Sequence, residues 1–406
     1  MRRLCACVMM GLLFIGLSVL EVYSDETGND DLSAKVSNLD NLFGKLKFYG
    51  DYRGRWEGNE TKQRKSVTTA DYVHWRNRYR YRLRLGLQAR INDEIMLNTR
   101  MAGGTGRTST NQTYTGGSLN DNWGVDLAYF QYKPHWVKDW LTLYIGKMNN
   151  PLYNTQMIFD SDLTPEGASI HTNWKEVFGT KWNVYSDVFG YIINESATRN
   201  QDAWVWGGGA GFLGNIGNFV DLKAGANYYT WIKPEMVAQT WTTSTTTPGN
   251  LVRLDGQMLS EFDVLEAKGN LKFKALDHQV ILTGSYIVNT SANADTDGKK
   301  WDDGIYGQAK FGKMTKAGKN KDVGDWWLSY MYYDLAPDAT PAIFADADLR
   351  GTNTKSHEIE LEYKFLPNTT IGGTAHFIGP HVRYNPFYGT ELRDVNLYFI
   401  DVVTNF

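Results

Sequence analysis

The chain has 406 residues, of which 42% are hydrophobic, 14% aromatic and 21% charged, and its formal net charge at pH 7 is −3. Its mean hydropathy of −0.43 excludes a helical membrane protein, because each spanning helix needs about 20 mostly apolar residues. The chain has 40 glycines but only 10 prolines, which is typical of strands and turns, and its small net charge argues against nucleic-acid binding.

Residues 1–24 have the layout of a secretory signal peptide. Arg2 and Arg3 precede an apolar stretch at residues 4–20, and a plausible cleavage site follows Ser24. A retained anchor helix is the alternative. Both cysteines of the chain lie in the apolar stretch, so we expect no disulfide, thiol nucleophile or cysteine-bound metal after cleavage.

Residues 25–43 are predicted to form a short helical or coiled segment. Leu32, Val36, Leu39 and Phe43 are spaced four, three and four residues apart, as on one face of a coiled coil. Such a short repeat is marginal as an isolated helix. A periplasmic stalk, a plug and a frayed tail all remain compatible with it.

Beyond residue 44 the sequence alternates with a period of two. In the stretch 75–91, Trp, Tyr and Leu residues occupy the odd positions, and arginines occupy most of the even ones. The arginines are Arg76, Arg78, Arg80, Arg82, Arg84 and Arg90. A helix would scatter them around its circumference, whereas a strand separates one apolar face from one charged face.

The same pattern predicts sixteen strands between residues 44 and 406. Their ranges are 45–56, 75–90, 94–102, 123–133, 140–147, 168–175, 180–193, 203–213, 219–231, 259–275, 278–289, 302–313, 325–335, 354–365, 369–380 and 393–406. Long connections follow the odd-numbered strands and mostly short turns follow the even-numbered ones, with 314–324 as the longer exception. Most of these strands exceed the typical globular length of about 5 or 6 residues.

These features predict an all-β fold, a transmembrane antiparallel β-barrel with long outer loops and short periplasmic turns. The lumen of a sixteen-stranded barrel is too wide for wall side chains to fill, so we expect it to hold water. The last strand ends in Phe406, preceded at steps of two by Thr404, Val402, Ile400 and Tyr398. This ending resembles the assembly signal of bacterial outer-membrane barrels.

Several segments within about the first 170 residues resemble the general porins of bacterial outer membranes, a family of sixteen-stranded β-barrels. They are the Gly-Asp-x-Arg-x-Arg stretch at 50–55, the arginine-rich second strand, the segments 127–134 and 143–147, and the Asp-Ser-Asp-Leu-Thr-Pro-Glu-Gly stretch at 160–167. The resemblance implies the outer membrane of a diderm bacterium, a homotrimer, and a third loop, 148–167, that folds into the lumen. The rest of the chain matches only in pattern, so no substrate preference is implied.

The charges of these segments predict a pore constriction with an acidic and a basic side. The third loop carries Asp160, Asp162 and Glu166. The facing wall would offer Arg53, Arg55, Arg78, Arg80, Arg82 and Arg84. Such a field would orient dipolar solutes and bias ion passage. The alternative is that the arginines coat a wet wall or pair with Asp51 and Glu94 nearby.

Two further motifs are interpreted as structural. The Gly-x-Gly-x-x-Gly pattern at 209–214 is followed by a turn and a strand, whereas a dinucleotide site needs a helix there. The stretch 293–298 resembles the start of a calcium loop, but Gly304 stands where a bidentate Glu is required. A weak divalent-cation site and a solvated loop both remain open for this stretch.

Taken together, the sequence predicts a channel for passive diffusion of small polar solutes and ions, embedded in outer-membrane lipid. We expect no enzyme activity, no cofactor, no metal and no nucleic-acid partner. Two other classes remain as alternatives. One is a non-conducting barrel that serves as an adhesin or surface-structural protein, and the other is a barrel enzyme with a catalytic set at its rim.

Overall fold

The computed structural model describes residues 44–66, 69–104, 109–114, 123–137, 140–197, 202–217, 219–234, 249–253, 257–314, 322–383 and 392–406. The chain divides into two units, residues 1–47 and 48–406. The predicted signal peptide and the predicted helical segment at 25–43 lie outside the described residues. Among the residues described, no helix is long and apolar enough to cross a membrane.

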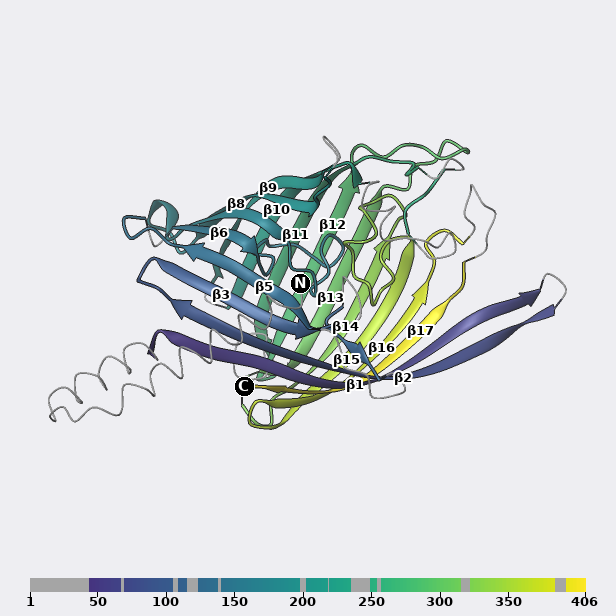
Figure 1. Cartoon of the computed structure of the whole chain (residues 1–406), viewed down its shortest axis with the longest axis horizontal. Helices are drawn as coiled ribbons and strands as arrows, with labels where there is room; N and C mark the ends of the chain where they lie inside the picture. The colour runs from purple at the N-terminus through teal and green to yellow at the C-terminus, as the bar shows by residue number, and fades with distance from the viewer. Residues whose placement is uncertain are drawn as a thin grey trace, which may run out of the picture. The chain divides into compact units, whose positions relative to one another are not determined.

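The second unit is an antiparallel barrel, and its strands follow one another around the ring in chain order (Figure 1). In the described part of the chain we find sixteen long strands and one two-residue strand, β4. They are β1 (Leu46–Ser66), β2 (Thr69–Arg90), β3 (Ile95–Gly103), β4 (Gln112–Thr113), β5 (Trp123–Tyr132), β6 (Leu141–Lys147), β7 (Glu166–Trp174), β8 (Asn183–Asn194), β9 (Ala203–Ile216), β10 (Val220–Ile232), β11 (Phe262–Ala275), β12 (His278–Asn289), β13 (Asp303–Lys313), β14 (Trp326–Leu335), β15 (Thr354–Leu366), β16 (Thr369–Gly379) and β17 (Val395–Asn405).

Pairing between the first and last strands closes the barrel. β1 pairs antiparallel with β17 from Asp51 opposite Asn405 to Thr61 opposite Val395, and it pairs with β2 on its other edge. The backbone N–H of Phe406 donates to the Gly50 carbonyl at 3.1 Å, and the Gly50 N–H donates back at 2.9 Å. Closure matters because every backbone polar group in lipid needs a partner. The predicted fold class is confirmed.

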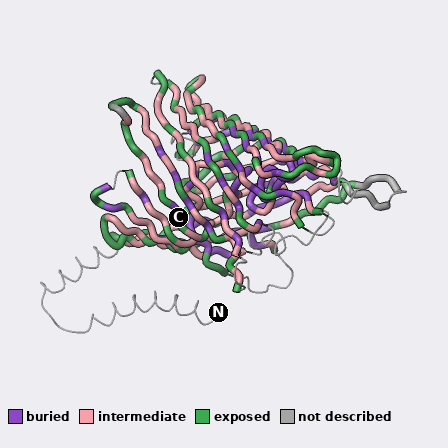
Figure 2. The backbone as a smooth tube through the Cα atoms, turned by 90° about the horizontal axis from the view of Figure 1, so that it is seen from above, coloured by how far each residue is buried: buried purple, intermediate pink, exposed green. Residues whose placement is uncertain are grey.

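Exposure alternates along many of the strands (Figure 2). On β15, Ile359 and Leu361 point outward and are 47% and 51% exposed, whereas Ser356 and Glu358 point inward and are 0% and 9% exposed. On this strand the arrangement is the reverse of that in a soluble protein, in which apolar side chains gather inside. An apolar outer surface suits contact with lipid.

Short turns connect the strands at one end of the barrel. Leu276 and Asp277 join β11 to β12 and have φ values of 51° and 61°. Two consecutive residues with positive φ are typical of the type I′ turn, whose twist matches that of the flanking strands. Pro367 and Asn368 join β15 to β16 in a similarly short connection. The turns predicted at these two places are confirmed.

Two predicted loops contain strand. The range predicted as the loop 57–74 is mostly β1 and β2, whose purple hairpin reaches beyond the neighbouring strands in Figure 1. Its charged side chains lack the apolar alternation by which strands were predicted, but backbone pairing does not require that alternation. Within the predicted loop 103–122, β4 pairs with Arg80 and Tyr81 of β2.

Where β1 meets β17 and closes the barrel, no room is left for a side chain at Gly50. A substitution at this position therefore tests how tightly the closure is packed. A Cβ there would collide with the Arg84 carbonyl oxygen and lie 2.7 Å from the Phe406 ring. At Gly54, four residues along the same strand, the nearest atom would be 3.9 Å away. We expect Gly50→Ala to lower the heat-stable folded fraction in gel-shift assays, while Gly54→Ala leaves it near the original value. Equal heat stability of the two variants would contradict a seam packed at Gly50.

Candidate functional site in the barrel lumen

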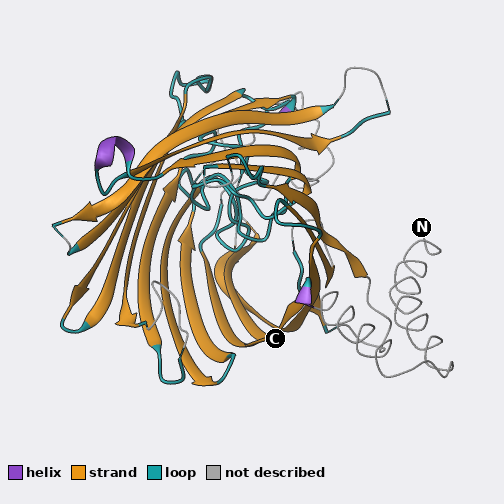
Figure 3. Ribbon diagram, turned by 90° about the vertical axis from the view of Figure 1, so that its left-hand side faces the viewer, coloured by secondary structure: helices purple, strands orange, loops and turns teal. Residues whose placement is uncertain are grey.

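The connection between β6 and β7, residues 148–165, lies against the inner surface of the barrel. Asn227 of β10 donates from Nδ2 to the Tyr153 carbonyl at 2.7 Å. Lys268 of β11 donates from Nζ to the Asn154 carbonyl at 2.5 Å. Because three strands separate β6 from β10, the connection runs across part of the lumen, and Figure 3 shows loop segments inside the ring of strands.

Glu266 of β11 is the main polar anchor of this connection. Glu266 is only 1% exposed, and its carboxylate accepts hydrogen bonds from the Thr155 N–H at 2.8 Å and from the Thr155 hydroxyl at 2.7 Å. Tyr229, Asn227 and Ser285 also donate to it, at 3.1, 3.4 and 3.3 Å. A buried carboxylate is costly unless its oxygens are satisfied, and here the donors of the connection help to satisfy them.

The connection between β14 and β15, residues 336–353, also folds inward, and both connections pack into one apolar cluster. Phe159 of the first connection lies 5.8 Å from Phe344 of the second, between ring centroids, and 6.1 Å from Tyr229 of β10. The cluster includes Met148, Leu152, Met157, Ile158, Phe189, Tyr191, Val205, Trp231, Phe262, Val264, Ile287, Tyr306, Met331, Tyr333, Leu335 and Leu349. Wall side chains alone do not fill the lumen, and the two connections occupy part of the space that they leave.

Backbone hydrogen bonds join the two connections. The Asp160 N–H donates to the Phe344 carbonyl at 2.7 Å, and the Asp160 carboxylate accepts from the Ala347 N–H at 2.9 Å. The Asp346 N–H donates to the Gln156 carbonyl at 3.0 Å. Burial raises the pKa of Asp160 to about 6, and burial together with the charge of Asp160 raises that of Asp346 well above its usual range. Acidic groups thus gather where the connections meet.

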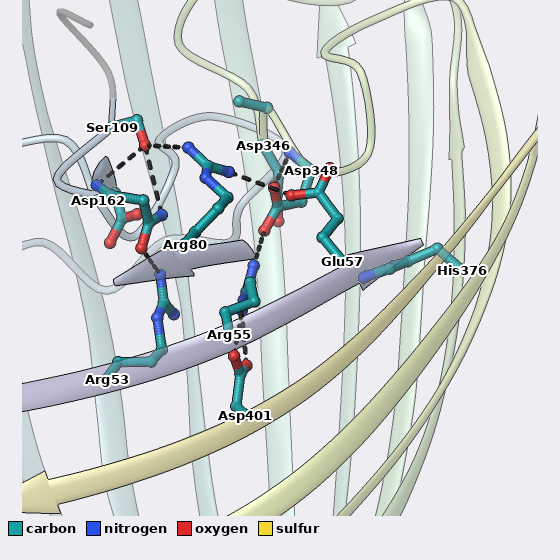
Figure 4. Close-up of polar contacts among 12 residues, drawn as sticks. Arg53, Arg55, Glu57, Arg80, Ser109, Asp162, Asp346, Asp348, His376 and Asp401 are labelled. Atoms are coloured by element: carbon teal, nitrogen blue, oxygen red, sulfur yellow. Dashed lines mark hydrogen bonds and ion pairs between the residues drawn. The ribbon is translucent and has the colours of Figure 1, made fainter. Parts of the chain in front are cut away.

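A cavity of about 410 Å³ remains between these acids and the wall formed by β1, β2 and β15–β17. Figure 4 shows the arginines reaching into this region from β1 and β2. Its charged lining consists of Arg53, Arg55, Arg80, Arg82, Asp160, Asp162, Asp346, Asp348, Glu358 and Glu360, with His376 beside them. The structure therefore brings six of the nine predicted site residues together around one cavity.

The other three predicted residues do not line this cavity. Arg78 pairs with Glu57, and Arg84 pairs with Asp51 at 2.6 Å. Glu166 is the first residue of β7 rather than part of a loop, and its exposed carboxylate pairs with Lys147 at 2.6 Å. The sequence prediction began this strand two residues later and so assigned Glu166 to the acidic loop.

Most arginines of the two strands are held by carboxylates of the same wall. Arg55 makes two parallel hydrogen bonds of 2.7 Å to Asp401, an arrangement that fixes a guanidinium strongly. Arg82 pairs with Asp51 at 2.8 Å, and Arg80 pairs with Glu57 at 3.3 Å. The alternative of pairing with Asp51 is thus correct for Arg82 and Arg84.

Pairing with Glu94, the other half of that alternative, is wrong. The Glu94 carboxylate binds His135 at 2.7 Å instead. Glu94 lies in the short turn between β2 and β3, whereas the arginines of the cavity lie midway along β2.

Several residues of the site were not predicted from the sequence. Glu358 and Glu360 stand two apart on β15, so their shared inward face was visible in the alternation. Asp346 and Asp348 enter the lumen only because their connection folds inward, and strand periodicity does not report such a path. The same is true of Asn111, whose side chain accepts a hydrogen bond from Arg53.

The two motifs interpreted as structural have ordinary roles. The glycines at 209–214 lie in β9, which leads through a turn to β10. In the calcium-like loop, the Asp295 carboxylate accepts from the Asp297 and Lys299 N–H groups at 2.9 Å and from the Trp301 ring N–H at 2.8 Å. Its oxygens are thus engaged within the loop itself.

Comparison with known proteins confirms the resemblance. Residues 56–250, close to half of the chain, match the family described as "Putative porin". No curated protein sequence matches the chain. The fold is similar to OprB of Pseudomonas putida (TM-score 0.52, 11% identity, 93% of this chain and 97% of that one). It is also similar to OmpF of Salmonella typhi in complex with daunomycin (TM-score 0.50, 10% identity, 89% and 97%).

The anchoring role of Glu266 can be tested by hydrogen–deuterium exchange. Glu266→Ala leaves the donors of Thr155, Tyr229 and Asn227 without their acceptor, and each lost buried hydrogen bond costs about 1 kcal/mol. We expect peptides covering 148–165 to exchange about tenfold faster or more, because opening of the connection becomes easier. Glu261→Ala, which removes an exposed glutamate beside the same strand, is the control. Unchanged exchange in the Glu266 variant would show that the apolar cluster alone holds the connection.

Proposed function

We propose that this chain, an outer-membrane porin of a Gram-negative bacterium, passes small hydrophilic solutes and ions by passive diffusion through a constriction at the charged cavity. The observation that carries the proposal is the cavity itself, bordered by arginines of β1 and β2 on one side and by acids of two inward-folded connections on the other. The family match and the barrel fold support a channel rather than an enzyme.

The opposed charges suit a constriction that selects by charge. Protein walls of low dielectric focus the field between such groups into the water that separates them. Around the described part of the cavity, the acids outnumber the arginines, and Arg55, Arg80 and Arg82 are already paired with carboxylates of the wall. We therefore infer a modest preference for cations when all these acids are ionised.

The apolar cluster supports a second candidate function. Because the two connections and the inner wall share a dry core, much of the lumen on the side of β8–β14 is occupied. A barrel narrowed in this way would suit a surface-structural protein or an adhesin that does not conduct. Conductance of the refolded protein separates the two functions.

Removing two arginines should make the channel more cation-selective. At about 10 Å in a water-like dielectric, each unit charge is worth about 0.4 kcal/mol to a passing ion. We expect Arg80→Ser combined with Arg82→Ser to lower the anion-to-cation permeability ratio by about sixteenfold, because anions lose about fourfold and cations gain about fourfold. The readout is the reversal potential in planar bilayers under a salt gradient.

The matched control removes the same number of charges from the same strand. Arg76→Ser combined with Arg90→Ser alters two exposed residues of β2 away from the cavity, and the reversal potential should change little. If both double variants have the reversal potential of the original protein, the cavity is not the selectivity site.

Selectivity should also depend on pH through Asp160. Burial raises the pKa of this carboxyl to about 6, so the group is charged at pH 8 and mostly neutral at pH 5. Acidification thus removes negative charge from the cavity, and the preference for cations should fall as the pH is lowered through about 6. Asp160→Asn, which keeps the size of the side chain, should flatten this dependence. If the cation preference of the Asp160→Asn variant changed just as steeply with pH, the titrating group would be one other than Asp160.

A further inference from the structure

The rim of the barrel that carries the short turns has large apolar side chains where turns are usually polar. Leu276, in the turn between β11 and β12, is 87% exposed, and Phe219, between β9 and β10, is 82% exposed. Turns are mostly built from Gly, Pro, Asn, Asp and Ser. Further large apolar residues of this rim that are more than half exposed are Phe48, Ile91, Trp136, Val323, Leu366 and Phe406.

The turn at Leu276 shows that local structure does not favour these residues. Leu276 and the following Asp277 have φ values of 51° and 61°. This left-handed backbone is unfavourable for leucine, whereas asparagine and glycine adopt it readily. Because the Leu276 side chain is almost fully exposed, packing against the rest of the chain does not stabilise it either. Contact with something outside the chain remains as the reason for a leucine here.

Polar neighbours give these turns two chemical faces. Asp277 directly follows Leu276, and Asn92 directly follows Ile91. Segments that combine apolar and polar side chains in this way are typical of a membrane–water interface, where the apolar groups reach the acyl chains and the polar groups stay among the headgroups.

The length of the strands places the turns at such an interface. On β11, Asp263 shares the outward face with Leu265 and Leu271, which are exposed and apolar. A strand tilted by about 45° crosses the hydrocarbon core in about 9 to 11 residues. Residues 265–275 make up this length, so Leu276 lies at the inner boundary of the core.

The same count gives the same result on β15. Lys355, near the outer end of this strand, is charged and exposed on the outward face. Residues 356–366 then make up the crossing length of about 9 to 11 residues. They end at Leu366, the exposed apolar residue next to the turn.

The distribution of these residues around the rim favours lipid as the occupant. They occur from Phe48 near the start of β1 to Phe406 after the end of β17. A protein bound at one side would cover only a sector of the rim, whereas a bilayer surrounds it. Phe406 also continues the outward face of β17, on which Ile400 and Val402 are 50% and 39% exposed. The apolar rim is thus continuous with the surface of the wall that faces lipid.

We propose that the short-turn rim is a lipid-binding surface whose apolar side chains insert into the acyl region of the inner leaflet. Short turns of outer-membrane barrels face the periplasm, so the inner leaflet is the one that adjoins them. Insertion fixes the depth of the barrel in the membrane, with Asp277 and Asn92 among the headgroups. This inference concerns the position of the barrel in the bilayer and does not depend on whether the barrel conducts.

The test is fluorescence quenching of a bimane label at position 276 in phospholipid vesicles. The chain from residue 25 onward has no cysteine, so Leu276→Cys gives a unique attachment site after removal of the predicted signal peptide. We expect bromine atoms on the lipid acyl chains to quench this label and aqueous iodide to leave it bright. A label on Asp277→Cys, the other residue of the turn, is the matched control and should show the reverse.

Two outcomes of this experiment would overturn the proposal. Equal quenching by iodide at positions 276 and 277 would show that both side chains lie in water. A label at position 276 that neither quencher reaches would show that protein covers the rim. Leu366→Cys and Asn368→Cys repeat the comparison at a second turn, so the result does not depend on the folding of one variant.

A stability measurement gives opposite signs for the two surroundings. In water, Leu276→Asn should stabilise the turn, because asparagine suits the left-handed backbone. In lipid the same change removes a buried leucine side chain, and we expect the ratio of folded to unfolded protein in urea titrations of vesicles to fall by about fivefold. Asp277→Asn, which removes no apolar surface, is the control. A ratio that rises in the Leu276 variant would contradict insertion.

Discussion

The site depends on a packing constraint inside the barrel: the apolar halves of two connections must be buried against β8–β14. A ring of sixteen long strands encloses more space than its own inward side chains fill. Ile158 and Phe159 of the first connection and Phe344 of the second are buried in the cluster that occupies part of this space. Asp160 directly follows Phe159, and Asp346 lies two positions after Phe344. Burial of the two phenylalanines therefore places both carboxylates at the edge of the cluster, toward the arginines.

Strand geometry supplies the basic side of the site by a separate and simpler route. Residues two apart on a strand share a face, so Arg53 and Arg55 on β1 and Arg80 and Arg82 on β2 necessarily point into the same lumen. Carboxylates of the same wall then neutralise most of them, which keeps parallel guanidinium groups from repelling one another. Arg53 is the exception, and its neutral partner Asn111 reaches it from the segment around β4.

Periodicity was sufficient to predict the strands because alternation is a local property of a half-exposed sheet. It located the arginines of β2 and both short turns around Leu276 and Pro367. It was insufficient for residues 57–74, where polar side chains hide a hairpin held by backbone pairing. Local pattern was also insufficient for the anchor: Thr155 and Glu266 are 111 positions apart, and their contact depends on the path of a connection through the lumen. For the same reason Asp346 and Asp348 were not predicted, although Glu358 and Glu360 carried a visible signal.

Single-channel recording of the refolded protein in a planar bilayer under a salt gradient tests the central claim most directly, because it asks whether the cavity between the arginines and the acids is an open path for ions. Large, steady current steps with a preference for cations at a pH where the acids of the cavity are ionised would agree with a water-filled passage in which the acids outnumber the free arginine charge. A folded, heat-stable barrel that passes no current would contradict the account. The two inward-folded connections would then close the lumen, and a surface-structural function would explain the fold better.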